Sequence, residues 1–105
     1  MSNVIEVSDS NFEVEVLRSP VPVLVDFLGE HCGPCRMLKP VILALAESLG
    51  DSVKIVTVDV AANERLVNDY RISAVPTLIV FKDGKERDRM VGLKDMKYLM
   101  EALAV

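Results

Sequence analysis

The residues in this sequence best suited to chemistry are its two cysteines, which stand together in Cys32-Gly33-Pro34-Cys35. An apolar run from Val21 to Leu28 precedes them, and a helix-like stretch follows. Two thiols so spaced at a helix start can close a small disulfide ring, and the positive end of the helix can stabilise a thiolate that attacks another disulfide. The sequence therefore predicts a redox motif rather than a scaffold.

The alternative roles for this pair are a structural bridge and a metal site. A structural zinc ion takes about four ligands from cysteine, histidine or acidic side chains. Besides the two cysteines, the chain offers only one histidine, His31, as a soft donor. We therefore expect no metal.

Composition limits the fold and the partners. The 105 residues are enough for one hydrophobic core but not two, so we expect a single domain over residues 1–105. Half of the residues are apolar and 27% are charged, a balance typical of soluble globular proteins. The formal net charge of -4 argues against a nucleic-acid partner, because such proteins carry a basic face for the phosphates.

The sequence indicates neither a membrane span nor a secretory signal. No apolar run is long enough to cross a bilayer, and the first residues lack the basic and apolar regions of a secretory signal. Two cysteines cannot build the multi-bridge framework of a small secreted domain. We expect a cytoplasmic protein with no membrane partner.

Hydrophobic periodicity predicts the order of strands and helices. Strands are expected at residues 4–7, 23–28, 53–58, 77–81 and 86–91. Helices are expected after Ser10, which has capping-box spacing to Glu13, and over about 35–49, 66–70 and 96–103. Pro40 should kink or slightly break the long helix, and Asp83-Gly84 suits a tight hairpin turn.

This order calls for a mixed sheet with helices on both faces. The nearly continuous apolar run at 23–28 is typical of a strand covered on both faces, so we expect a central parallel strand there. Asp26 interrupts this run, and burial of its carboxylate should raise its pKa. The alternative is an Asp at a strand end that points to solvent.

Several short motifs together indicate a family. They are Val25-Asp26-Phe27, Cys32-Gly33-Pro34-Cys35-Arg36-Met37, Pro40, Asp59, Val75-Pro76-Thr77, Phe81, Gly84 and Val91-Gly92. In order and spacing, the chain resembles the thioredoxin family over essentially its full length. The resemblance implies the α/β thioredoxin fold, with a central mixed five-stranded sheet flanked by four helices.

The resemblance also implies roles for the motif. Cys32 would be the exposed nucleophile that forms a mixed disulfide with the substrate, and Cys35 the less exposed thiol that resolves it. Gly33 and Pro34 would restrict the ring that the disulfide closes. Pro34 also suits the first turn of the helix, because the amide it lacks would be unpaired there. Arg36 would modulate the site.

Asp26 would be the buried acid–base group that takes the proton from Cys35, through water. Many family members carry a lysine near this residue on the neighbouring strand, and the matching position here is Thr57. Without that cation the carboxylate is less stabilised as an anion, so we again expect a raised pKa for Asp26.

The substrate would bind beside Pro76, which resembles the family's cis-proline and would present the backbone of Val75 to a peptide. From spacing alone, a trans proline that starts a strand is expected instead. Ala74, Val75, Gly92 and Leu93 would complete an apolar shelf around the disulfide. Alternatively, Gly92 serves only the turn into the last helix.

The chain departs from the family at two aromatic positions. Family members usually have Trp where this chain has Leu28 and His31, and the chain contains no Trp. A protonated His31 beside the Cys32 thiolate would stabilise the reduced form and make the protein more oxidising than a relative with Trp. The alternative is a His31 that points to solvent without effect.

The function that the resemblance implies is that of a protein dithiol–disulfide oxidoreductase. It would be a monomeric electron carrier without a bound cofactor, reducing disulfide-containing protein substrates and being re-reduced by a thioredoxin reductase-type partner. That reductase would use either flavin and NADPH or an iron–sulfur centre and ferredoxin. The alternatives are a more oxidising oxidase or isomerase and a non-enzymatic binding subunit. A glutaredoxin fits less well, because the tetrapeptide lacks that family's aromatic residue.

Overall fold

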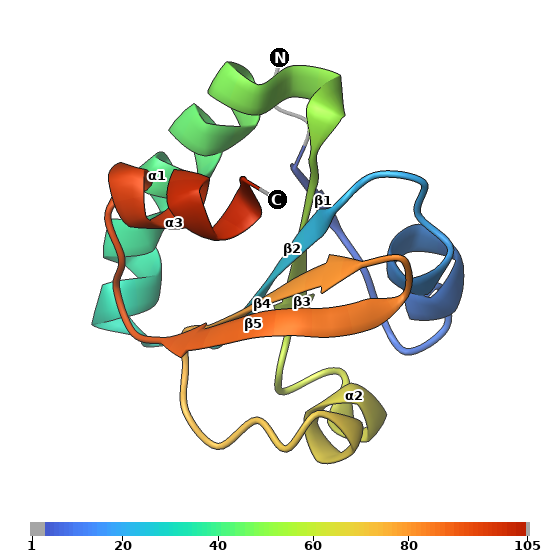
Figure 1. Ribbon diagram of the computed structural model, residues 1–105. Coiled ribbons are helices and arrows are strands. Elements are labelled where there is room, and N and C mark those ends of the chain that lie inside the picture. The colour runs from blue at the N-terminus through green and yellow to red at the C-terminus, as the bar shows by residue number, and fades with distance from the viewer. Residues whose placement is uncertain (1–3, 105) are drawn as a thin grey trace.

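The five predicted strands form one mixed sheet, in the order β1-β3-β2-β4-β5 (Figure 1). The computed structural model describes residues 4–104. The strands are β1 (Val4–Glu6), β2 (Val23–Leu28), β3 (Lys54–Asp59), β4 (Thr77–Lys82) and β5 (Lys85–Val91). The helices are η1 (Glu13–Leu17), α1 (Gly33–Leu49), α2 (Glu64–Asp69) and α3 (Met96–Leu103), with a short turn, η2 (Gly50–Ser52), after α1. The predicted α/β architecture with four helices is confirmed.

Strand β2 lies at the centre of the sheet, as predicted. It pairs in parallel with β3 and antiparallel with β4, so Asp26 lies opposite Thr57 on one side and Leu78 on the other. The expectation of a parallel strand therefore holds for one edge only. The reason is that β4 and β5 form an antiparallel hairpin, and this hairpin pairs with the second edge of β2.

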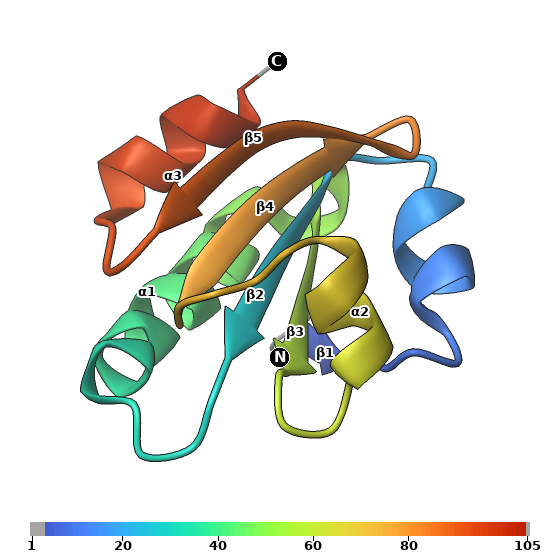
Figure 2. The ribbon, with the colours of Figure 1, turned by 90° about the horizontal axis from the view of Figure 1, so that it is seen from below.

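Helices cover both faces of the sheet, with α1 and α3 on one face and η1 and α2 on the other (Figure 2). Side chains alternate along a strand, so Val23, Val25 and Phe27 enter the core beneath η1 and α2, whereas Leu24 enters the core beneath α1 and α3. Asp26 follows Leu24 by two positions. Its carboxylate therefore belongs to the face beneath α1.

Helix α1 carries a buried apolar stripe that includes Leu38, Ile42 and Leu45. The helix is continuous over 17 residues, including Pro40, so the slight break expected there does not occur. The missing amide of a proline removes one backbone hydrogen bond, and the buried stripe on both sides of Pro40 holds the helix together.

The N-terminal helix departs furthest from its prediction. Helix η1 is a five-residue π-helix, and the residue before it, Phe12, makes no side-chain capping bond. The hydroxyl of Ser10 instead lies 2.9 Å from that of Ser8, whose backbone N–H donates to Asn11 Oδ1 at 2.7 Å. The predicted capping box is wrong because these local turn hydrogen bonds replace it.

The hairpin between β4 and β5 turns at Asp83 and Gly84, whose φ angles are 54° and 77°. Two residues with positive φ match the tight turn predicted from the Asp-Gly pair. A Cβ atom at Gly84 would lie 2.9 Å from the backbone oxygen of Leu17. Glycine is therefore required both by the turn and by the close approach of η1.

We predict that Gly84→Ala lowers the free energy of unfolding by about 1 to 3 kcal/mol, because the methyl group strains the turn and presses on the Leu17 carbonyl. Urea unfolding followed by circular dichroism measures this. Gly33→Ala is the matched control, since nothing lies within 4 Å of a Cβ there. Equal stability of Gly84→Ala and the wild type would contradict the packing of the hairpin on η1.

Candidate active site

The two cysteines form a disulfide at the N-terminus of α1, with their Cα atoms 5.2 Å apart. Cys32 is the N-cap residue, and its Sγ accepts a hydrogen bond from the backbone N–H of Cys35 at 3.1 Å. The helix begins at Gly33, with Pro34 in its first turn. The amide that reaches Cys32 Sγ is one that a helix start leaves unpaired, and it can equally stabilise a thiolate on that atom.

The exposure of the cysteines differs from expectation. Cys32 is 8% exposed and Cys35 is 9% exposed, so Cys32 is not the more exposed of the two in the disulfide form. The reason is that Cys32 Sγ lies against the loop that contains Val75, 3.8 Å from the carbonyl oxygen of that residue. What distinguishes the two sulfur atoms is the helix-start amide, which points at Cys32.

Asp26 is buried beneath this disulfide, with 3% of its surface exposed. Its Oδ1 atom has no hydrogen-bond partner among residues 4–104. Burial raises the pKa of Asp26 from 3.8 to about 7. The expected rise in pKa is confirmed, and the alternative of a solvent-facing carboxylate is wrong. The neighbouring strand supplies no cation opposite it, since Thr57 lies there.

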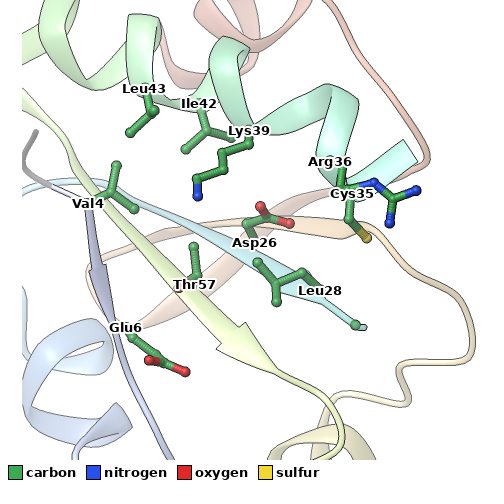
Figure 3. Close-up of a pocket in the computed structure, with 11 residues that line it drawn as sticks. Val4, Glu6, Asp26, Leu28, Cys35, Arg36, Lys39, Ile42, Leu43 and Thr57 are labelled. Atoms are coloured by element: carbon green, nitrogen blue, oxygen red, sulfur yellow. The ribbon is translucent and has the colours of Figure 1, made fainter. Parts of the chain in front are cut away.

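One pocket of about 450 Å³ is lined by both Asp26 and Cys35 (Figure 3). Thr57, Arg36 and Lys39 also line it. The volume exceeds by several-fold the roughly 30 Å³ that one water molecule occupies, so water can fill the space. Water can therefore reach both Cys35 and Asp26.

The loop before β4 lies beside the disulfide. Its Val75–Pro76 bond is cis, as the family resemblance implies. The Thr77 hydroxyl donates to the Ala74 carbonyl at 2.6 Å, and the Gly92 N–H donates to the Pro76 carbonyl at 2.8 Å. These bonds hold the loop from two sides. The backbone N–H of Val75 has no partner within the described part of the chain.

Gly92 occupies the turn that follows β5, where its φ of 93° suits glycine. Its bond to Pro76 places it beside the loop that precedes β4, and its part in substrate binding stays a prediction. The neighbouring side chains Val91 and Leu93 are 54% and 43% exposed. An apolar surface therefore extends from Gly92, as the resemblance implies.

A second hollow near Val75 was not predicted from the sequence. It measures about 310 Å³ and is lined by Val60, Val67, Ile72, Ser73, Ala74 and Val75. The available signal was the apolar character of two loop residues, Val60 after β3 and Ile72 before Val75-Pro76. Loop residues have no periodicity, so nothing in the sequence places them together.

His31 and Arg36, which flank the disulfide segment, are both exposed. His31 has a φ of 54°, which is uncommon outside glycine, and it is exposed. It makes no hydrogen bond or salt bridge to Cys32 within residues 4–104, so its electrostatic effect stays a prediction. Arg36 is exposed, and its backbone N–H donates to the Cys32 carbonyl at 3.2 Å.

Comparison with known proteins decides the family. The family model described as Thioredoxin matches residues 3–105. The chain belongs to the thioredoxin family. It is 40% identical over 95 residues to the thioredoxin of Rickettsia prowazekii, covering 90% of each chain. It is 46% identical over 92 residues to thioredoxin 1 of Synechococcus elongatus, covering 88% of this chain and 86% of the relative.

A third relative, thioredoxin 1 of a Nostoc species, is 42% identical over 103 residues, which are 98% of this chain and 96% of the relative. Family membership and the disulfide-bonded Cys-X-X-Cys pair together make this protein a dithiol–disulfide oxidoreductase. Over the described residues, no helix has the length and apolar character needed to span a membrane. Within the same part of the chain, no group of three or more His, Cys, Asp or Glu residues could hold a metal ion.

The raised pKa of Asp26 makes a prediction about stability. Because its folded value of about 7 lies above the ordinary 3.8, the folded protein holds a proton between these pH values that the unfolded chain has released. The free energy of unfolding should therefore fall as pH rises from about 4 to 7, by up to about 4 kcal/mol from this group.

We predict that Asp26→Asn, which never ionises, is more stable than the wild type at pH 8 by about 2 to 4 kcal/mol, with the difference approaching zero near pH 4. Denaturant unfolding of the disulfide form across this pH range measures it. Asp51→Asn, at an exposed carboxylate in η2, is the control and should show no such trend. A difference that stays constant from pH 4 to 8 would argue against the raised pKa.

Proposed function

We propose that this protein reduces disulfide bonds in protein substrates, with Cys32 as the nucleophile and Cys35 as the resolving thiol. The observation that carries the proposal is the hydrogen bond from the Cys35 N–H to Cys32 Sγ, at the start of a helix that lies above a buried acid. The amide favours negative charge on Cys32 and leaves Cys35 to be activated by Asp26.

The proposed reaction has two steps. The Cys32 thiolate attacks a substrate sulfur, forms a mixed disulfide and releases the other substrate sulfur as a thiolate, which takes up a proton. Asp26 then accepts the proton of Cys35 through water, and the Cys35 sulfur attacks Cys32 and releases the second substrate thiolate. Two electrons pass to the substrate, and the Cys32–Cys35 disulfide closes. A carboxyl group whose pKa is about 7 can both accept and return a proton at neutral pH.

The substrate is proposed to bind across the loop of Ala74, Val75 and Pro76. The backbone N–H of Val75 is unpaired among residues 4–104, and its carbonyl oxygen lies 3.8 Å from Cys32 Sγ, so an extended peptide can pair with it as an added strand. The hollow beside Val75 is lined in part by Val60, and its apolar side chains can bind an apolar side chain of the substrate. Gly92 adjoins the loop on the other side through its hydrogen bond to Pro76.

Regeneration of the dithiol is proposed to come from a thioredoxin reductase-type partner, with this chain acting as a monomeric cytoplasmic electron carrier. The electrons reside in the cysteine pair, so the cycle needs no prosthetic group. Either a flavin- and NADPH-dependent or an iron–sulfur and ferredoxin-dependent reductase can supply them. A coupled disulfide-reduction assay with each class of reductase distinguishes the two.

We predict that Cys35→Ser accumulates a mixed disulfide on Cys32, because the resolving sulfur is gone, whereas Cys32→Ser loses at least about a thousandfold in activity. Mass spectrometry of the protein after reaction with a disulfide-bonded substrate measures the adduct. The wild type, treated in the same way, should show none at completion. A Cys32→Ser, Cys35→Ser double variant that retains the full biological role would instead favour a non-enzymatic binding subunit.

The second candidate is an oxidase or isomerase, and the observation that favours it is the exposed His31 directly before Cys32. We predict that His31→Trp makes the redox potential more negative by up to about 30 mV, which is a factor of about ten for a two-electron couple. Equilibration with a glutathione redox buffer measures this. His31→Gln tests charge without an aromatic ring and should shift the potential in the same direction. Unchanged potentials in both variants would reject the electrostatic role.

A further inference from the structure

Residues 70–76 carry the chain from the end of α2 to the start of β4, and they include the loop across which the substrate is proposed to bind (Figure 2). Strand β5 and the residue after it hold this segment at both ends. The guanidinium of Arg89 donates a hydrogen bond to the Tyr70 carbonyl at 2.7 Å. The backbone N–H of Gly92 donates to the Pro76 carbonyl at 2.8 Å. The second bond joins two backbone groups, whereas the first depends on one side chain.

The segment leaves α2 through a backbone conformation that side chains rarely adopt. Arg71 has a φ of 54°, and the N–H of Ile72 donates to the Val67 carbonyl at 2.9 Å. A helix that ends with this hydrogen bond usually has glycine at the left-handed position, because other residues are strained there. The Tyr70 carbonyl belongs to the peptide group that precedes Arg71. The bond from Arg89 to that carbonyl therefore restrains the chain at its strained point.

The ring of Tyr70 anchors the end of α2 in a different way. It packs against Phe12, Phe27 and Phe81, with ring centroids 5.5, 6.5 and 5.4 Å apart. These contacts place the end of α2 on the sheet, but they leave the peptide group after Tyr70 free to turn about its backbone bonds. The Arg89 bond supplies a restraint that the core packing does not.

A β-bulge places Arg89 and Glu86 on the same face of the sheet. The register between β4 and β5 shifts at Arg87, which is an extra residue in β5. Residues three apart in a regular strand lie on opposite faces, but here Glu86 lies opposite Phe81 and Arg89 lies opposite Ile79, both in the core beneath α2. Glu86 accepts two hydrogen bonds from Arg89, at 2.8 and 2.9 Å. This pair fixes the plane of the guanidinium and directs its remaining nitrogen to the end of α2.

We propose that Arg89 is a positioning residue for the substrate loop: by holding the Tyr70 carbonyl, it fixes the path of residues 71–76. Glu86 is its orienting partner. The proposal rests on the function proposed above for this loop. Arg89 takes no part in the sulfur or proton chemistry, so its effect falls on the binding of a substrate chain.

The hollow beside Val75 connects this restraint to substrate binding. Val67 on α2 and Ile72 just after it line one part of the hollow, and Ala74 and Val75 line another. A change in the direction of the chain at the end of α2 therefore alters both the hollow and the position of the Val75 N–H. When fewer molecules hold the competent conformation, the apparent affinity for a substrate falls by the same fraction.

The test is Arg89→Met in the full chain, with dithiothreitol as the electron source and two disulfides as substrates. Insulin has a peptide chain that can pair with the loop, and hydroxyethyl disulfide has none. We expect the KM for insulin to rise about three- to tenfold at nearly unchanged kcat, and the rate with hydroxyethyl disulfide to stay within about twofold. The effect is modest because the Arg89 and Glu86 side chains are 32% and 35% exposed. Arg89→Lys keeps a donor for the carbonyl and should recover most of the KM.

The mobility of the loop is measured directly by nitrogen-15 relaxation of the amides of residues 73–75. We expect lower order parameters for these amides in Arg89→Met than in the wild type. Arg87→Met is the matched control, because it removes an arginine two positions away on the same strand. The Arg87 side chain makes no hydrogen bond or salt bridge among residues 4–104. This control should leave the KM and the order parameters unchanged.

Unchanged order parameters in folded Arg89→Met would overturn the proposal, as would an equal effect of Arg87→Met. An equal loss of rate with both disulfides would also overturn it, since the effect would then lie on the chemistry. Failure of the proposed function has a different signature. If the amides of residues 73–75 become more mobile while the KM for insulin is unchanged, the restraint by Arg89 is supported and the binding of substrate across this loop is rejected.

Discussion

The site depends on one constraint, a carboxylate buried where strand alternation calls for an apolar side chain. Asp26 lies two positions after Leu24 on the face of the sheet beneath α1, and it is 3% exposed. Burial disfavours its charged form and raises its pKa to about 7. The fold thus holds a group that is balanced between two protonation states close to Cys35. The free-energy cost of burying this carboxylate is the same effect that gives Asp26 the pKa its proposed role as a base requires.

The topology of the sheet gathers the rest of the site at one edge. Strand β2 ends just before the cysteines, β4 begins just after Pro76, and β5 ends just before Gly92. The register places Phe27 opposite Thr77, and Thr77 opposite Val91, so these three strand ends lie in one row. The antiparallel hairpin of β4 and β5 pairs with the edge of β2 that faces away from β3. It therefore brings the loop before β4 beside the start of α1, which follows β2.

Much of this arrangement could be predicted from local sequence. The bounds of β2 followed from its continuous apolar run, and the redox pair followed from two thiols at a helix start, since both are local properties. The cis bond of Pro76 could be expected only from the family resemblance. The covering of Cys32 by Val75 joins segments that lie 43 positions apart in the sequence, so spacing alone gives no sign of it. The capping role of Ser10 failed because competing turn hydrogen bonds have the same sequence signature.

The central claim is that Cys32 carries the substrate and that the proton of Cys35 leaves through Asp26. The most direct measurement is a rapid-quench experiment on the wild type from pH 5 to 9, in which the mixed disulfide with a substrate protein is quantified over time. We expect an adduct on Cys32 whose rate of resolution rises with pH, with a midpoint near the Asp26 pKa of about 7. A resolution rate independent of pH, or an adduct on Cys35, would contradict it.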